Sequence, residues 1–163
     1  MTILSRRTAF AACTALAAFA ALAGPTFAGE CPADKTGVDV TKPTAPEATT
    51  PKGLTDTVLS AIDLAKTGAQ FAGYQIRIRQ LTIEPGGVVP WHSHGERPSN
   101  IYIISGAITE YRSSCAVPIE HRAGEVIPEF GQISHWWRNN TDKPMVLISA
   151  DLFHAKMHDD HAM

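Results

Sequence analysis

The sequence has no surplus of charge of either sign: 14 Lys and Arg residues stand against 16 Asp and Glu residues, and the formal net charge is −2 with neutral histidines. The charged residues are scattered rather than gathered into basic or acidic runs. Nucleic acids and anionic membranes bind concentrated positive charge, which this chain does not offer. We therefore expect no nucleic-acid partner and no membrane association of the mature protein.

Long hydrophobic runs are also scarce, and the one clear apolar stretch lies near the N-terminus, over 8–23. It is shorter than the roughly 20 residues that a membrane-spanning helix needs. Arg6 and Arg7 precede it, and a small-residue cleavage pattern follows it. We predict a signal peptide over 1–28 and a mature protein that is periplasmic or secreted. The segment 5–10 also resembles a twin-arginine export signal, with general secretion as the alternative.

Cysteine is rare: the chain has three, and Cys13 lies in the predicted signal peptide. Cys31 and Cys115 remain, an even number in a protein that we expect in an oxidising compartment, where disulfides persist. We predict a disulfide between them. It would fasten a proline- and threonine-rich arm, residues 29–53, to the rest of the chain. The prolines predict an extended arm rather than a packed element.

Helical periodicity is scarce beyond residue 53. The segment 54–66 fits either a helical stripe or a strand, and we favour a strand. From Gly73 onward, apolar and polar residues alternate in short runs separated by turn residues, as in an all-β barrel or sandwich. We expect one β domain over 54–154, followed by a histidine-rich tail over 155–163. The predicted strands after Gly73 cover 74–83, 88–94, 100–104, 107–112, 117–121, 125–128, 133–138 and 144–153.

The first of these runs alternates isoleucine with arginine. Ile76 and Ile78 occupy one face of the predicted strand, and Arg77 and Arg79 occupy the other. Because arginine is mostly exposed in folded proteins, we expect the arginine face to be the solvent side.

His92 and His94 stand two residues apart in a predicted strand. Residues i and i+2 of a strand project from the same face, so both imidazoles can point at one site. His135 lies in a later predicted strand and can supply a third nitrogen. Three neutral imidazoles are a typical ligand set for a transition metal and leave coordination positions for water or substrate. We predict a metal site made of these three histidines.

The residues around the histidines resemble the two sequence blocks of the cupin superfamily. The first block has a glycine, five residues, His-x-His and a closing glycine; the second has a glycine, a histidine and, four residues later, an asparagine. The resemblance is dense over 81–139 and implies an all-β, single-domain antiparallel jelly-roll barrel with a metal near one open end. The matching residues are Gly86, His92, His94 and Gly106 in the first block, and Gly124, His135 and Asn139 in the second.

The chain departs from the cupin pattern at two places. Ser99 stands where the first block has a glutamate that is a fourth metal ligand in many cupins. Glu129-Phe130-Gly131 stands where the second block has a Pro-x-Gly turn. The fold expectation survives both departures, but a four-ligand site does not follow. We therefore expect a three-histidine site, with Glu96 either as a substitute carboxylate ligand or as an exposed loop residue.

This resemblance implies one divalent transition metal, with Fe(II) favoured and Zn, Ni, Cu or Mn also suited to three imidazoles. For binding substrate, the candidates are Arg97 as a carboxylate clamp, Tyr102 and Trp137, with loop exposure or core packing as the alternatives. We expect an exported metal-binding cupin that acts as a mononuclear non-haem metal enzyme, like the three-histidine dioxygenases, on a small polar molecule. The alternatives are a non-catalytic periplasmic cupin that binds a metal or small ligand, and a metal-free structural barrel. As in many cupins, a homodimer is the expected assembly.

Overall fold

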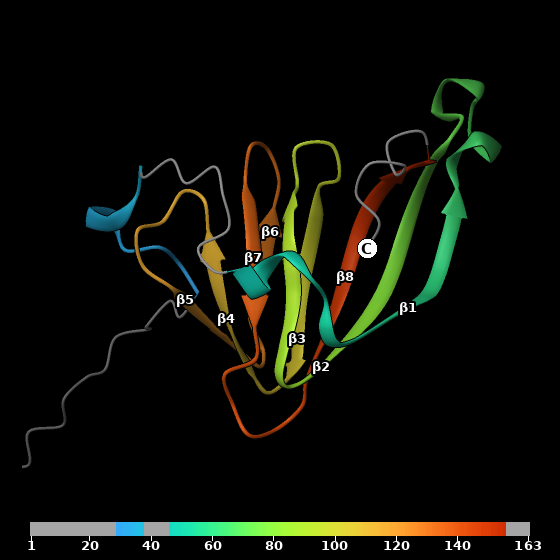
Figure 1. The fold of residues 1–163 in the computed structure, drawn as a ribbon. Helices are drawn as coiled ribbons and strands as arrows, with labels where there is room; N and C mark the ends of the chain where they lie inside the picture. Colours follow the sequence, from blue (N-terminus) through green and yellow to red (C-terminus); the bar gives the residue numbers. More distant parts are fainter. Residues whose placement is uncertain (1–28, 38–45, 156–163) are drawn as a thin grey trace, which may run out of the picture.

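The computed structural model describes residues 29–37 and 46–155 (Figure 1). Strands make up most of the regular structure, and the remaining elements are 3-10 helices of one turn, η1 Ala33–Lys35, η2 Pro46–Thr49, η3 Leu64–Lys66 and η4 Ala69–Phe71. The strands are β1 Lys52–Asp63, β2 Tyr74–Ser93, β3 Ser99–Ser105, β4 Ala107–Arg112, β5 Ile119–Arg122, β6 Val126–Glu129, β7 Ser134–Arg138 and β8 Met145–His154. The predicted signal peptide and nearly all of the predicted histidine-rich tail lie outside the described residues.

All strand pairings are antiparallel, in the order β5-β4-β7-β2-β8-β3-β6, and β1 adds to the side of β2. The sheet curls on itself so that one face points inward (Figure 1). This architecture confirms the predicted all-β jelly-roll barrel. The ambiguous segment 54–66 is a strand over most of its length, as favoured from the sequence. Within the described part of the chain, no helix is long and apolar enough to cross a bilayer.

One strand, β2, serves both halves of the sheet. Its residues 74–83 pair with β8, and its residues 88–93 pair with β7. The Pro85-Gly86-Gly87 segment between them bends the strand without reversing it, and Gly86 adopts a φ of 72°, which favours glycine. Backbone hydrogen bonds with Asn139 hold the bend, at 2.9 Å from the Gly86 N–H and 3.0 Å to the Gly87 carbonyl. The bend is why one strand can carry both the arginines and His92.

The inner face of the curled sheet holds the main apolar core. Its members alternate with outward-facing residues along β2, β3 and β8, as the period of two for side chains in a strand requires. The buried cluster is Leu81, Ile83, Val89, Ile101, Ile103, Ile108, Ile127, Trp137, Met145 and Leu147.

The expectation that Arg77 and Arg79 face solvent is wrong. Both side chains are buried on the inner face, whereas Ile76 is 45% exposed on the outer face. Arg77 is the cross-strand partner of Asp151 and donates two hydrogen bonds to its carboxylate, at 2.9 and 2.7 Å. Isoleucine and arginine do lie on opposite faces of β2, as the alternation predicted. The arginine face points inward because Asp151 on β8 compensates the buried guanidinium charge.

The N-terminal arm is attached to the barrel at three places. The predicted disulfide between Cys31 and Cys115 is present, with the two Cα atoms 5.8 Å apart. Thr36 forms a β-bridge with Cys115, next to a 2.9 Å hydrogen bond from the Ala116 N–H to the Lys35 carbonyl. Ala48 is fully buried in a cluster with Val88 and Trp136. The arm is therefore partly packed, which corrects the expectation of a fully extended segment.

Candidate metal centre

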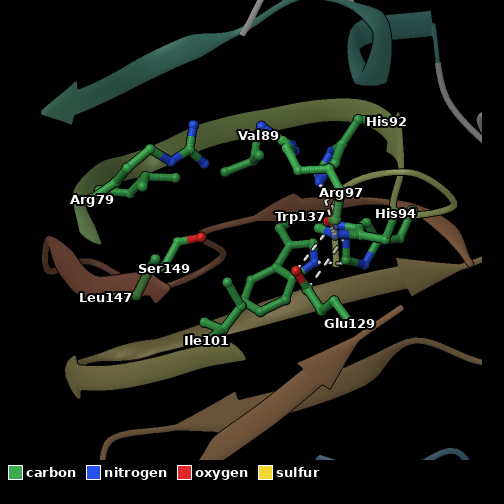
Figure 2. A pocket seen from close by; sticks show the side chains of 12 residues that line it. Arg79, Val89, His92, His94, Arg97, Ile101, Glu129, Trp137, Leu147 and Ser149 are labelled. Atoms are coloured by element: carbon green, nitrogen blue, oxygen red, sulfur yellow. Dashed lines mark hydrogen bonds and ion pairs between the residues drawn. The ribbon is translucent and has the colours of Figure 1, made fainter. Parts of the chain in front are cut away.

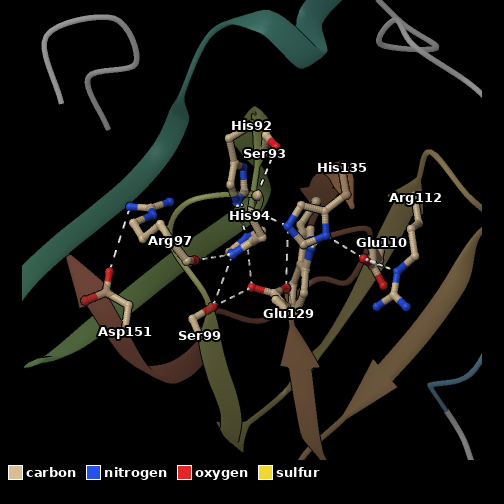
Figure 3. A network of polar contacts seen from close by, with 12 residues as sticks. His92, Ser93, His94, Arg97, Ser99, Glu110, Arg112, Glu129, His135 and Asp151 are labelled. Atoms are coloured by element: carbon tan, nitrogen blue, oxygen red, sulfur yellow. Dashed lines mark hydrogen bonds and ion pairs between the residues drawn. The ribbon is translucent and has the colours of Figure 1, made fainter. Parts of the chain in front are cut away.

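Three histidines from two neighbouring strands meet inside the open end of the barrel (Figure 3). His92 on β2 and His135 on β7 are direct cross-strand partners, and His94 follows the last residue of β2. The Nε2 atom of His92 lies 2.9 Å from that of His94 and 3.1 Å from that of His135. The structure therefore brings together the three residues that the sequence singled out.

The opposite nitrogen of each ring is held by an oxygen acceptor. The Nδ1 atom of His92 lies 2.8 Å from the Pro90 carbonyl, and that of His94 lies 3.0 Å from the Arg97 carbonyl. The Nδ1 atom of His135 lies 2.5 Å from Glu110 Oε1. A carbonyl or carboxylate oxygen can only accept, so each Nδ1 carries the proton.

The protonation of Nδ1 determines which groups can bind between the three rings. With Nδ1 protonated, a ring in its neutral form presents a bare lone pair at Nε2, and the three Nε2 atoms face one another. Lone pairs about 3 Å apart repel unless a proton or a cation lies between them. The Trp137 indole nitrogen also lies 3.0 Å from His135 Nδ1, but the ionised Glu110 requires the proton to stay on that ring nitrogen. The arrangement fits a divalent transition metal.

A carboxylate that the sequence analysis missed completes the group. Glu129 on β6 is 2% exposed, and its Oε2 atom lies 3.0 Å from His94 Nε2. Its Oε1 atom lies 3.5 Å from His135 Nε2 and is buried without a hydrogen-bond partner. Glu96, the alternative carboxylate, is exposed in the loop after His94. A fourth potential ligand is thus present, but it comes from a different strand.

Ser99, the residue at the usual glutamate position, contacts this carboxylate directly. Ser99 on β3 and Glu129 on β6 are cross-strand partners, and the Ser99 hydroxyl donates a 3.0 Å hydrogen bond to Glu129 Oε2. Partners across an antiparallel pair project from the same face of the sheet. A carboxylate at position 129 on β6 therefore reaches the same histidines as a glutamate at position 99 on β3 would. The sequence held one signal: Glu129 follows Ile127 by two residues and shares its inward face.

Burial and neighbouring charges shift the pKa values of the three histidines in different directions. Burial, followed by the charges of His135 and His94, lowers the pKa of His92 well below its usual value. Burial and the charge of His135 lower the pKa of His94 to about 3. Burial alone would lower the pKa of His135 too, but the Glu129 and Glu110 carboxylates outweigh it and raise that pKa. Burial raises the pKa of Glu129. His92 and His94 are therefore neutral, whereas His135 and Glu129 retain a proton more readily than the free side chains do.

A second buried layer orients His135. Glu110 on β4 is fully buried between His135 and His121, whose Nε2 atom lies 2.9 Å from Glu110 Oε2. Burial would raise the pKa of Glu110, but hydrogen bonds from both histidines hold it well below the usual range. Arg112 donates a 2.8 Å hydrogen bond to the same carboxylate. His121 is completely buried and stacks on Trp137 at 5.1 Å between ring centroids.

A pocket opens beside the histidines (Figure 2). Two of the predicted substrate-binding residues, Arg97 and Trp137, line it, and Arg79 lines its other end. Tyr102 does not: its side chain is 47% exposed on the outer face of β3. That prediction is wrong because β3 turns Ser99 and Ile101 inward, and Tyr102 falls on the opposite phase of the alternation.

Comparison with known proteins supports the same conclusion about the fold. A family model described as a cupin domain matches residues 79–151, which include the three histidines, Glu129 and every pocket-lining residue. Residues 79–151 therefore match the cupin superfamily. A search of curated proteins returns no match.

Solved structures resemble this cupin at low sequence identity. The polyketide cyclase RemF from Streptomyces resistomycificus is 19% identical, with a TM-score of 0.51 over 73% of this chain and 74% of that one. The Schizosaccharomyces pombe Cnp3 cupin domain is 9% identical, with a TM-score of 0.50 over 73% and 79%. A predicted oxalate decarboxylase from Thermotoga maritima is 16% identical, with a TM-score of 0.48 over 62% and 80%. At these identities the similarity shows the fold alone.

Proposed function

We propose that this cupin binds one divalent transition metal through His92, His94, His135 and Glu129. The observation that carries the proposal is the convergence of three Nε2 lone pairs about 3 Å apart, each fixed by an acceptor at Nδ1. The orphaned Oε1 atom of Glu129 adds an unused negative donor at the same point. Fe(II) is the favoured ion, and Zn, Ni, Cu and Mn also suit these donors.

The proposed activity is that of a mononuclear non-haem metal enzyme acting on a small polar molecule. When bound, the ion would supply a Lewis acid and a template for substrate and dioxygen. The protein side chains do the rest. Glu110 keeps the His135 ring in one tautomer, and Trp137 with Leu81 and Leu147 forms an apolar pocket wall that excludes water. The disulfide between Cys31 and Cys115 supports export to an oxidising compartment.

Metal analysis of the purified mature protein tests the first step. After anaerobic reconstitution with Fe(II) or Zn(II), we expect about one ion per chain, and less than a tenth of that in a His92→Ala variant. His154→Ala, which removes a histidine outside the centre, is the matched control and should leave the stoichiometry unchanged. An absence of stoichiometric metal in the wild-type protein would refute the proposal.

Oxygen uptake tests the catalytic step with the Fe(II)-loaded protein. Small thiols, β-diketones and aromatic diols form the screen, and substrate-dependent uptake that disappears in the His92→Ala variant is the expected result. No uptake, together with tight stoichiometric ligand binding, would identify a non-catalytic binding protein instead.

Metal binding is expected to release about one proton at pH 6. Three ordinary histidines, each with a pKa near 6.5, would together release roughly two. Here His92 and His94 are already neutral because their pKa values are lowered, and the proton that must leave is the one retained by His135 or Glu129, whose pKa values are raised. Isothermal titration with Zn(II) in buffers of different ionisation enthalpy counts the protons. A release of two or more protons would contradict this charge distribution.

A further inference from the structure

Two arginines line the pocket. Arg79 on β2 is buried at the end away from the histidines, and the partly buried Arg97, in the loop before β3, lies nearer to them (Figure 2). Ser149 lies on the inner face of β8 as the cross-strand partner of both Arg79 and Ile101, and it lines the same pocket. Two guanidinium groups and a hydroxyl therefore form one wall of a cavity whose opposite wall is the candidate metal centre.

Arg79 and Arg97 have N–H donors that are not used in hydrogen bonds within the protein. The neighbouring Arg77 takes up both carboxylate oxygens of Asp151 with its two hydrogen bonds. Arg79 forms an ion pair with Asp56 through Nη1 at 2.9 Å, but its Nε atom is buried without a hydrogen bond and lies 3.6 Å from Asp151. Among the described residues, the Arg97 guanidinium forms one ion pair, a long one of 3.9 Å to Asp151. Neither side chain is saturated by its neighbours.

The charges on this wall do not balance. Three guanidiniums, those of Arg77, Arg79 and Arg97, face two carboxylates, those of Asp151 and Asp56. Burial, and then the positive charge of Arg79, lower the pKa of Arg97, which is the cost of holding cations together away from water. Glu129 also lines the pocket and acts on Arg97, but it contacts the histidines; without it, the three guanidiniums exceed the two carboxylates by one charge.

Between the two polar ends the pocket is apolar. Leu81, Val89, Ile101, Trp137 and Leu147 line its middle. The empty space along it, with the open mouth counted in, is about 350 Å³. A ligand that fills it meets metal ligands at one end, hydrocarbon in the middle and guanidinium at the other.

We propose that Arg79, Arg97 and the Ser149 hydroxyl form a carboxylate-binding subsite. The substrate would then be a small monocarboxylic acid whose second donor group lies across an apolar segment and reaches the metal centre; this substrate class rests on the metal-dependent function proposed above. A planar carboxylate matches the fork of an arginine and accepts two parallel hydrogen bonds from it. A single negative charge also matches the imbalance of the wall.

Binding of paired probes to the Co(II)-loaded protein tests the subsite. We choose 3-(imidazol-1-yl)propanoate and 4-(imidazol-1-yl)butanoate, with their primary amides as uncharged counterparts, and follow the visible absorption of cobalt. In the wild-type protein the carboxylates should bind at least about tenfold more tightly than the amides, because a charge-assisted hydrogen bond is worth more than a neutral one. In Arg79→Gln and Arg97→Gln this preference should fall to about threefold or less.

Arg122→Gln is the matched control, because Arg122 lies on β5 with its side chain exposed and paired with Glu120. It should keep the wild-type preference. Equal binding of carboxylate and amide to the wild-type protein would overturn the subsite, and so would an equal loss of preference in Arg122→Gln. If Arg79→Gln fails to fold, as circular dichroism would show, Arg97→Gln and the wild-type comparison decide the question.

Failure of the metal site is distinguishable from failure of the subsite. If cobalt does not bind, the proposed function fails, and titration of the metal-free protein with benzoate and benzamide then tests the arginines alone. A benzoate preference of tenfold that Arg79→Gln removes supports the subsite without any metal. No preference there would overturn it.

Discussion

Glu129→Ser is expected to weaken binding of a divalent metal about 100-fold. Structural zinc sites gain roughly 10–16 kcal/mol from about four ligands, so one ligand contributes on the order of 3 kcal/mol, or about two powers of ten in affinity. Within the described part of the chain, Glu129 is the one carboxylate whose oxygens lie within 3.5 Å of the Nε2 atoms of two histidines, and its Oε1 atom has no hydrogen-bond partner. Competition against a chromophoric chelator with Zn(II) or Co(II) measures the change.

A second substitution should reverse much of this loss. Because Ser99 and Glu129 are cross-strand partners on the same face, Ser99→Glu in the Glu129→Ser background puts the carboxylate on β3 but leaves it near the histidines. We expect the double variant to recover at least about tenfold of the lost affinity. Glu96→Ser, which removes the exposed loop carboxylate, is the control and should have no effect. Wild-type affinity in the Glu129→Ser single variant would show that this carboxylate is not a ligand.

Removal of the disulfide by Cys31→Ser with Cys115→Ser should destabilise the mature protein by about 4 kcal/mol. The bond closes a loop across 84 residues, and the chain-entropy relation gives about 4–5 kcal/mol for a loop of that length. The expected fall in the melting temperature is roughly 10–20 °C. The Thr36 bridge and the packing of Ala48 should keep part of the arm in place, so the strands themselves should persist.

Calorimetry with and without reductant checks this prediction. Reductant should bring the melting temperature of the wild-type protein down to that of the double variant and leave the variant unchanged. The Zn(II) affinity serves as an internal control, because the cysteines lie outside the metal centre, and it should stay within about threefold. Alkylation of both cysteines before reduction, detected by mass spectrometry, would contradict the bond.

The sequence was sufficient to locate the strands and to identify the three histidines, because both can be recognised from local sequence patterns. Alternation with a period of two located the strands, and it placed His92 and His94 on one face. The spacing of the second cupin sequence block then pointed to His135, on another strand. The pairing of Cys31 with Cys115 followed from their number once Cys13 was assigned to the predicted signal peptide. None of these steps requires knowledge of which strands are neighbours.

Only the tertiary structure decided which polar residues face the centre. Ser99 alone predicted a site without a carboxylate, but pairing of β3 with β6 sets Glu129 opposite it. Alternation placed Arg77 and Arg79 on one face, but pairing of β2 with β8 supplied Asp151 and turned that face inward. The physical reason is the same in both cases. The cost of burying a charge depends on its partner, and the partner of a strand residue lies at a distant position in the sequence that strand register alone determines.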